Sequence, residues 1–521
     1  MNIGRTLGVF VVCLASAASF AAPDSIVPTP PSPPRPPRRC PTDFAAGRVV
    51  LPAALRERVD APKKTAWEQA RGGQVAAIPH IKDRLRGWPE RLLVDRHSLP
   101  QTDDAFARRV ARDTWRGLDA LSDREHGLPV DTVRFGSGSV DIAAARIGDY
   151  ASGTDVGLHL TAVVAARELG FLPAAETVER LRRTLATVAG LEHYRGLLFN
   201  YYDTTSLERT SNFVSFIDTA WLTAGLMVVR AAVPELAAEC TRLIDRQNLG
   251  FFYDGEHEVV SHGYYVHPGR ASPFHYGMFF TEARLGCLIG IGKGELPADV
   301  WFAMVRTFPP DCRIGPPPVQ VRRQTVLGHT IESGYCDWRG VRYVPSWGGS
   351  MFEALMPTVV LDELRHAPDG LGANARAHVA VQRRYAAEDL GSPVWGLSPC
   401  TTPDGGSYGE YGAAMLGVRG YAAGPVTPHA SALALAVAPE AALANLRTLA
   451  ERYDVYGDYG FYDVVDPATG RVAQTYLALD QSMLFLALAN HLCAGCVQTH
   501  FAADPIIQKV LPLLQAERFF D

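Results

Sequence analysis

The sequence has no strong excess of charge of either sign. Its 521 residues include 50 Lys and Arg against 55 Asp and Glu, a formal net charge of −5, without a long block of like charges. A protein that binds the nucleic-acid backbone needs a basic surface, so this balance argues against a nucleic-acid partner. With 47% hydrophobic residues, the composition is that of a globular protein rather than a disordered or fibrous one.

The sequence also lacks a hydrophobic run long enough to cross a membrane. The N-terminal run, Leu7–Leu14, is short, follows Arg5 and precedes small residues that offer a cleavage site near Ala22. A transmembrane helix needs about 20 apolar residues, so residues 1–22 predict a secretory signal peptide, with no transmembrane helix after its removal. We therefore expect a periplasmic or secreted protein. Residues 23–42 are rich in proline and predict an extended linker.

Motifs of several other enzyme classes are missing. The sequence contains no Gly-x-Ser-x-Gly elbow, Walker loop or Rossmann fingerprint. Four histidines, His257, His262, His267 and His275, are scattered over one segment without an i, i+4 pair on a helix. Metal sites usually need such fixed spacing or a cysteine partner, so we expect neither a metal nor another cofactor.

Cysteine is present but not in a metal-binding pattern. Of nine cysteines, Cys13 lies in the signal segment, and the remaining even number permits disulfides in an exported protein. Cys493 and Cys496 have C-x-x-C spacing without a second ligand pair. We expect a disulfide or inert thiols there rather than redox or zinc chemistry.

From about residue 103, apolar residues recur at the three- and four-residue spacing of amphipathic helices. The predicted helices cover 105–122, 154–168, 175–189, 214–232, 235–245, 278–292, 297–306, 350–365, 370–386, 427–436, 439–452 and 480–492. Twelve helices in pairs can close into an (α/α)6 toroid whose long loops form a cleft at one face. We therefore predict one all-α domain over residues 103–498, with a mixed prelude (43–102) and a C-terminal extension (499–521).

The predicted loops mix aromatic residues with carboxylates, in the segments 199–203, 251–256, 263–265, 408–412 and 456–463. Flat aromatic faces cover the C–H faces of sugars and carboxylates bind hydroxyls, so the mixture is typical of carbohydrate sites. A single loop of this kind would more often be a turn with half-buried tyrosines, but five favour function. Tyr202, Asp203, Tyr265 and Tyr411 are the candidates for substrate binding.

Three carboxylates lie where burial would alter their acidity. Asp218, in an apolar helix, is either an acid with a raised pKa or a structural residue bonded to a neighbouring hydroxyl or indole. Glu353, in a first helical turn, is either functional or complements the helix dipole. Asp480 is either a site residue or an N-cap. Glu282 and Arg284 are two residues apart on an apolar helix and do not share a face, so any ion pair between them is weak. For Arg284 by itself, a structural role is favoured over a functional one.

Several short sequence segments resemble those of a known family and occur in the same order along the chain. The most specific are Trp-Gly-Gly-Ser-Met-Phe-Glu (347–353) and Tyr-Asp-Gly-Glu-His-Glu (253–258). Others are ARDTWRGLDALSDREHGLPVD (111–131), SGTDVGLHLTAVVAARELGFL (152–172), FNYYDTTSLE (199–208), FVSFIDTAWL (213–222), TEARL (281–285), VWGLS (394–398) and YLALDQS (476–482). Over residues 105–492 the chain resembles the glucoamylase-like family, which includes secreted endo-β-1,2-glucanases and the helical toroid region of cyclic β-1,2-glucan synthases.

The resemblance implies an (α/α)6 fold and chemistry at the glycosidic bond of a β-glucan, with the β-1,2 linkage as the leading candidate. By position it implies that Asp218 is the general acid and that Asp131 is the base or a substrate ligand, with Glu353 as a further catalytic candidate. The remaining substrate-binding candidates are Asp155, Asp203, Glu282, Arg284, Trp347, Trp395 and Asp480.

The sequence departs from the family pattern at two places. The position of Asp218 tends to carry Glu in the glucanases, and Trp395-Gly-Leu-Ser is followed by Pro399 and Cys400 rather than by a Glu. The first hypothesis is an exported glycoside hydrolase or, as a variant, a transglycosylase. The alternatives are a glycan-binding or polysaccharide-export accessory protein without catalysis, and a polysaccharide lyase. Linkage, cleavage mode, stereochemistry and oligomeric state stay open.

Overall fold

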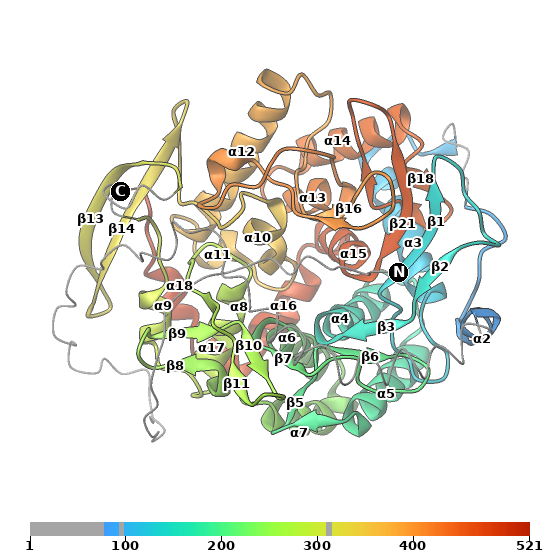
Figure 1. The fold of residues 1–521 in the computed structure, drawn as a ribbon, viewed down its shortest axis with the longest axis horizontal. Helices are drawn as coiled ribbons and strands as arrows, with labels where there is room; N and C mark the ends of the chain where they lie inside the picture. Colours follow the sequence, from blue (N-terminus) through green and yellow to red (C-terminus); the bar gives the residue numbers. More distant parts are fainter. Residues whose placement is uncertain (1–77, 93–97, 309–314, 521) are drawn as a thin grey trace.

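The computed structural model describes residues 78–92, 98–308 and 315–520 (Figure 1). The predicted signal peptide, the proline-rich linker and residues 43–77 of the prelude lie outside the described residues. Helices dominate the described part, and short strands occupy many of the connections between them.

Six helices, here called the inner helices, lie toward the middle of the view in Figure 1. They are α4 (Gly153–Glu168), α6 (Phe216–Ala232), α8 (Ala283–Gly292), α10 (Met351–Leu355), α13 (Pro428–Leu433) and α15 (Ala478–Leu492). Helix α4 packs on α6 and α6 on α8, while α10 packs on α13, α13 on α15, and α15 on α4. The step from α8 to α10 is made by Arg284, which donates to the backbone oxygen atoms of Glu353 and Ala354 at 3.2 and 2.7 Å.

Six outer helices alternate with the inner ones along the chain. They are α3 (Asp103–Ala120), α5 (Ala174–Gly190), α7 (Ala237–Arg246), α9 (Asp299–Ala303), α12 (Leu371–Glu388) and α14 (Pro439–Arg452). Each packs on an inner helix, in the pairs α3–α15, α5–α4, α7–α6, α9–α8, α12–α10 and α14–α13, and α3 also contacts α4. The twelve predicted helical segments are all represented. The segment predicted at 350–365 is broken after Leu355 by a 3-10 turn, Met356–Val359, that contains Pro357.

The apolar pattern explains which helices lie inside. In α7 only Cys240, Leu243 and Ile244 are buried, so one narrow stripe faces the protein. In α8 every residue is buried. A helix that is apolar all round is stable only where other elements cover it all round, which places α8 inside and leaves α7 at the surface.

The domain is not purely helical, which corrects the all-α prediction. Strand β1 (Thr132–Ser137) pairs with β2 (Arg146–Gly148) and with β21 (Val472–Leu477). Strands β13 (Pro318–Val326) and β14 (His329–Trp338) form the long hairpin at the left of Figure 1. Exposure alternates along most of β13, as expected for a strand with one covered face. Many other strands have two or three residues, too few to give a periodic signal.

The C-terminal residues pack onto the helical part. Helix α16 (Cys496–Ala503) contacts α4, α6 and α15. The Arg230 guanidinium donates to both carboxylate oxygens of Asp504 at 2.7–2.9 Å. Arg306 forms a fully buried ion pair with Glu517. These contacts attach residues 496–517 to the same core as the inner helices.

Cys493 and Cys496 form a disulfide, one of the two outcomes expected from their spacing. Among the described residues, Cys240, Cys287, Cys336 and Cys400 are buried free thiols. Burial raises the pKa of Cys240 to about 12, which keeps this thiol in its unreactive protonated form.

No single helix in the described part is both long and apolar enough to cross a membrane. Helices α15 and α16 together would be long and apolar enough to cross a membrane, but the chain bends by 95° between them. Most of α15 is buried among the other helices.

Candidate active site

Four inner helices carry an acid at their third residue: Asp155 in α4, Asp218 in α6, Glu353 in α10 and Asp480 in α15. A fifth acid, Glu282, directly precedes α8. Asp480 is not the predicted N-cap, because Leu477 holds that position and α15 has no side-chain cap hydrogen bond. Asp155 and Glu353 accept a free backbone N–H in a capping box, and all four acids suit the positive end of the helix dipole. The recurrence therefore has a local structural cause, and the chemistry depends on where these carboxylates lie relative to one another.

Asp218 is a half-buried residue in the first turn of α6. Its Oδ1 accepts hydrogen bonds from the backbone N–H of Thr154 at 3.2 Å and from Thr154 Oγ1 at 2.7 Å. Burial raises the pKa of Asp218 although the hydrogen bonds from Thr154 lower it. The predicted acid with a raised pKa and the predicted hydroxyl partner are therefore both present.

Asp155 lies close enough to Asp131 and to Asp218 to interact with the charges of both. Asp155 Oδ2 accepts from the N–H and Oγ of Ser152 at 2.9 and 2.8 Å, completing a capping box. Burial raises the pKa of Asp155 to about 7, assisted by the charges of Asp131 and Asp218. Asp131 is 8% exposed and accepts from Thr132 Oγ1 at 2.5 Å. The structure thus groups three of the predicted site acids.

Two glycines bring α4 and α6 into unusually close contact beside these acids. A Cβ atom at Gly157 would lie 2.2 Å from the backbone oxygen of Trp221, and one at Gly225 would lie 2.2 Å from the backbone oxygen of Gly157. No side chain larger than hydrogen fits without a shift of backbone. The glycines therefore set the helix separation on which the Thr154–Asp218 hydrogen bonds depend.

Glu282 and Glu353 form a second pair of buried acids. Burial, followed by the charge of Glu353, raises the pKa of Glu282 to about 7, and Glu282 Oε2 is buried without a hydrogen-bond partner among the described residues. Glu353 accepts from Ser346 Oγ and Gly348 N–H at 2.9 Å and from Ser350 N–H at 3.3 Å. Since these donors occupy the Glu353 carboxylate, the arrangement favours the capping alternative over a catalytic role for this residue.

Asp480 lies in a third acidic group with Asp463 and His429. Its Oδ2 is 3.3 Å from His429 Nδ1, and Asp463 Oδ2 accepts from Thr401 N–H at 2.7 Å. All three are buried. Burial and the charge of Asp463 raise the pKa of Asp480 well above its ordinary value, while burial lowers the pKa of His429 to about 3. The histidine is therefore neutral, and Asp480 retains a proton beside Asp463.

Arg284 does not reach a substrate, which corrects its predicted binding role. The side chain is 0% exposed and forms a bidentate ion pair with Glu363 at 2.7 and 2.9 Å. Its other hydrogen bonds go to backbone oxygens of Thr281, Glu353 and Ala354. Arg284 therefore holds α8 against α10.

Three other binding candidates are engaged within the loops. Tyr202 is 2% exposed, and its hydroxyl group donates to the Glu192 backbone and accepts from Phe199 N–H at 2.7 Å. Asp203 Oδ1 accepts from the N–H groups of Thr205 and Ser206 in a turn. Tyr265 is buried with its ring centroid 4.8 Å from that of Phe213. These contacts support structural roles for Tyr202, Asp203 and Tyr265.

The remaining aromatic candidates for substrate binding differ in how deeply their side chains are buried. Trp347 packs in a buried cluster with Met278, Phe308 and Val418, and Trp395 is also buried. Tyr411 is half-buried and packs against a small core under the β20–β21 strands, β20 being Val464–Val465. Of the three, Tyr411 is therefore the one best placed to offer a ring face to a sugar.

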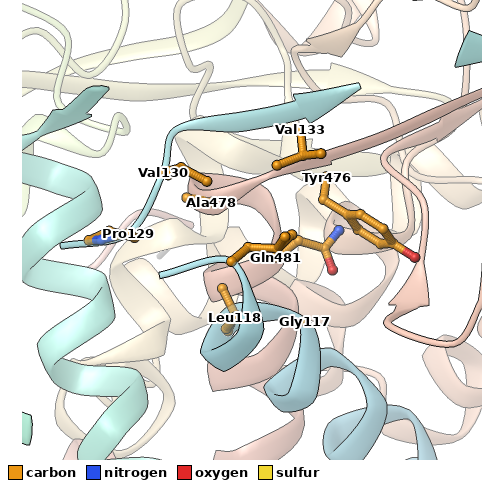
Figure 2. A pocket seen from close by; sticks show the side chains of 9 residues that line it. Gly117, Leu118, Pro129, Val130, Val133, Tyr476, Ala478 and Gln481 are labelled. Atoms are coloured by element: carbon orange, nitrogen blue, oxygen red, sulfur yellow. The ribbon is translucent and has the colours of Figure 1, made fainter. Parts of the chain in front are cut away.

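A small pocket is lined in part by Pro129 and Val130, the two residues before Asp131. Figure 2 shows Gly117 and Leu118 of α3 facing Val133 of β1 and Gln481 of α15 across it. Its volume of about 20 Å³ suits a water molecule and is far too small for a sugar residue.

Sequence reasoning missed several residues of the acidic groups. Thr154, His429 and Asp463 were not singled out as site residues. Tyr276 was also missed, although the charges of Glu282 and Asp218 both act on its hydroxyl group and help burial to raise its pKa. Asp463 ends one of the aromatic loops already considered, whereas nothing around Thr154 or His429 in the sequence marks either residue.

Comparison with known proteins confirms the family resemblance. Residues 314–505 match the family model described as "Putative glucoamylase", and residues 109–258 match a family described as a protein of unknown function, DUF3131. The chain is 25% identical to the cyclic β-(1,2)-glucan synthase NdvB of Rhizobium meliloti, with 78% of this chain aligned. It spans only 18% of the length of that relative.

Solved structures share the fold. A "putative glucoamylase" from Bacteroides caccae is 19% identical, with a TM-score of 0.62 over 80% of this chain and 99% of the other. The endo-β-1,2-glucanase from Chitinophaga pinensis is 16% identical, with a TM-score of 0.61 over 80% of this chain and 99% of the other. The endo-β-1,2-glucanase from Talaromyces funiculosus is 13% identical, with a TM-score of 0.58 over 81% and 90%. The chain therefore has the helical fold of glucoamylase-like proteins.

Proposed function

We propose that this protein is a glycoside hydrolase that cleaves a β-1,2-glucan, with Asp218 as the general acid. The observation that carries the proposal is the state of the Asp218 carboxyl group. Asp218 is a half-buried residue, burial raises the pKa of its carboxyl group, and Thr154 fixes the direction of that group. A general acid needs a proton near neutral pH, access to the substrate and a fixed orientation.

The second carboxylate of the reaction is Asp131 in this proposal. Asp218 donates its proton to the glycosidic oxygen, while Asp131 removes a proton from the attacking water. The charges of Asp131 and Asp218 both act on Asp155 and help to raise its pKa to about 7, so Asp155 holds a proton at acidic pH. A neutral Asp155 reduces repulsion and allows Asp131 to act as the base.

The finer architecture and the location belong to the same proposal. The alternation of inner and outer helices, with α15 packed on α4, supports an (α/α)6 toroid with the inner-helix acids at the floor of its substrate cleft. The N-terminal segment supports export to the periplasm or beyond. Cell fractionation of the full-length protein, with and without residues 1–22, tests export: retention of both forms in the cytoplasm would contradict it.

Product analysis tests the reaction. Purified wild type and Asp218→Asn are incubated with linear β-1,2-, β-1,3-, β-1,4- and β-1,6-glucans, and oligosaccharides are separated by chromatography. Asp104→Asn is the matched control, because Asp104 lies in the first turn of outer helix α3 and is exposed. We expect linear oligosaccharides from the β-1,2-glucan alone, lost in Asp218→Asn and kept in Asp104→Asn.

Other outcomes identify the alternatives. Binding of a glucan without products from any linkage would indicate a glycan-binding protein. If the protein neither binds nor cleaves any of the glucans, a glucan substrate is excluded. The sequence match to a protein named as a cyclic β-(1,2)-glucan synthase favours a second candidate, transglycosylation. In that reaction a sugar hydroxyl replaces water at the same acids, so cyclic or lengthened products would appear instead of short linear ones.

A further inference from the structure

Asp254, His257 and His275, here called the His–Asp cluster, converge in the segment between α7 and α8. Strand β8 (Tyr253–Asp254) pairs with β9 (Val259–Ser261), which also pairs with β12 (His275–Tyr276). Asp254 is opposite Val259, and His275 is opposite Ser261. Because residues two apart in a strand share a face, this register places Asp254 and His275 on the same face of the small sheet. His257 joins them from the turn between β8 and β9.

One carboxylate oxygen is the centre of the cluster. Asp254 Oδ2 lies 2.9 Å from His257 Nδ1 and 2.8 Å from His275 Nε2. The other oxygen, Oδ1, accepts from the N–H groups of Glu256 and His257 at 3.0 and 3.3 Å. The backbone therefore fixes the carboxylate so that its second oxygen points between two imidazole nitrogens. Such an outer hydrogen bond to a ligand is what orients metal-binding carboxylates.

The surroundings also favour a cation. The turn that carries His257 has the sequence Asp254-Gly-Glu-His-Glu258, and Glu256 in it is exposed. The side chains of Asp254 and His257 are 23% and 21% exposed, whereas His275 is 7% exposed. The cluster thus has a closed side, made by His275, and an open side through which an ion and a water molecule could enter.

In contrast to the expectation from the spacing of the histidines in the sequence, we propose that the His–Asp cluster is a binding site for a divalent transition-metal ion, with Zn²⁺ as the best fit. Two imidazoles and one carboxylate are ligands that zinc takes, and a solvent molecule would complete a tetrahedral set. The three ligand atoms lie within 4.8 Å of one another. Ligands of a tetrahedral zinc ion are about 3.3 Å apart, so binding would move each nitrogen about 0.5 Å away from Asp254 Oδ2.

This site would brace the strand next to the candidate active site. His275 is followed by Tyr276, whose hydroxyl group interacts electrostatically with Glu282 and Asp218. A metal that ties β12 to the β8–β9 turn therefore restrains a tyrosine beside two of the inner-helix acids. The metal site does not depend on the proposed hydrolase reaction, because its test measures metal binding rather than enzymatic activity.

Metal titration of the full-length protein tests the proposal. The protein is freed of its purification tag, dialysed against EDTA and then buffer, and titrated with Zn²⁺ by calorimetry, with thermal unfolding followed in parallel. We expect one Zn²⁺ per chain and a higher unfolding temperature with zinc. In His257→Ala and Asp254→Asn, we expect affinity to fall by at least about tenfold.

His267→Ala is the matched control, because His267 is exposed, belongs to the same segment and lies outside the cluster. Its zinc affinity should equal that of the wild type. The absence of saturable one-to-one binding in the wild type would overturn the proposal. So would wild-type affinity in His257→Ala and Asp254→Asn, or an equal loss in His267→Ala. Thermal unfolding of each variant without zinc verifies that it is folded.

Discussion

Thr154 donates two hydrogen bonds to one oxygen of Asp218, from its backbone N–H at 3.2 Å and from its hydroxyl group at 2.7 Å. The donor belongs to α4 and the acceptor to α6. Asp155 follows Thr154 directly, so the α4–α6 contact sets the positions of two acids at once. The proton-donating role proposed for Asp218 therefore depends on the packing of two helices as well as on its own burial.

Replacement of Thr154 by Val should move the pH profile of the reaction. The hydroxyl group stabilises the ionised form of Asp218 and lowers its pKa, so its removal should raise that pKa. A general acid fails above its pKa, and the alkaline limb of kcat/KM on β-1,2-glucan should therefore shift to higher pH. Thr154→Ser keeps the hydroxyl group and should retain the wild-type limb. An unchanged or lower limb in Thr154→Val would contradict this role.

The close contact of α4 and α6 predicts a cost for any side chain at Gly157. Gly157→Ala would place a methyl group 2.2 Å from the Trp221 backbone oxygen and should lower the free energy of unfolding by about 1–3 kcal/mol. At Gly190, which ends α5, a Cβ atom would meet none of the described residues within 4 Å, so Gly190→Ala should be neutral or slightly stabilising. Urea unfolding measures the change in the free energy of unfolding for each variant. Equal changes in the two variants would argue against a close α4–α6 contact at Gly157.

Glu282 should make the protein less stable as pH rises. Burial and Glu353 raise its pKa from 4.5 to about 7 on folding. Between these values the folded state takes up protons that the unfolded state does not, so the free energy of unfolding falls with increasing pH, in total by about 3 kcal/mol. Glu282→Gln cannot titrate and should lack this loss.

Thermal unfolding at pH 4.5 and 8 tests the effect of Glu282. Relative to wild type, Glu282→Gln should gain stability between the two pH values. Glu440→Gln is the control, since Glu440 is an exposed acid in the first turn of α14, and it should behave like wild type at both. A Glu282→Gln variant with the full pH dependence of wild type would show that this carboxyl group is not the source.

The Arg284–Glu363 pair predicts a strong coupling between α8 and the α10 region. Arg284→Met would leave Glu363, which is 0% exposed, without its cation and should cost about 3–5 kcal/mol of unfolding free energy. The double variant Arg284→Met/Glu363→Gln removes the stranded charge and should recover part of that loss. Denaturant titration of the two single variants and the double variant measures the coupling energy, and strictly additive losses would contradict it.

Much of the helical fold was predictable because its signal is local. Helices such as α4 and α14 follow apolar spacing and begin near the expected residues. The short strands were not predictable from periodicity, since pairs such as β1 with β21 join residues more than 300 positions apart. Their stability comes from tertiary pairing rather than from a pattern within either strand.

The candidate site was predictable only in part for a related reason. Acids in apolar surroundings, such as Asp218, stand out in a sequence, and capping explains why several occupy the third helical position. The partners of these acids do not stand out. Thr154 and His429 are ordinary helix-start residues whose role arises from distant contacts. The apolar setting of Arg284 already favoured a structural role, but its partner Glu363 could not be named from the sequence.

Asp218 is proposed to supply the proton to the leaving group, and substrates that do not need this proton give the sharpest test of that role. Wild type and Asp218→Asn are compared on β-1,2-glucan and on a β-1,2-linked oligosaccharide with a 2,4-dinitrophenyl leaving group. We expect Asp218→Asn to lose about 10²–10⁴-fold in kcat/KM on the glucan but to stay within about tenfold of wild type on the activated substrate. Equal losses on both substrates, or an undiminished rate on the glucan, would contradict the claim.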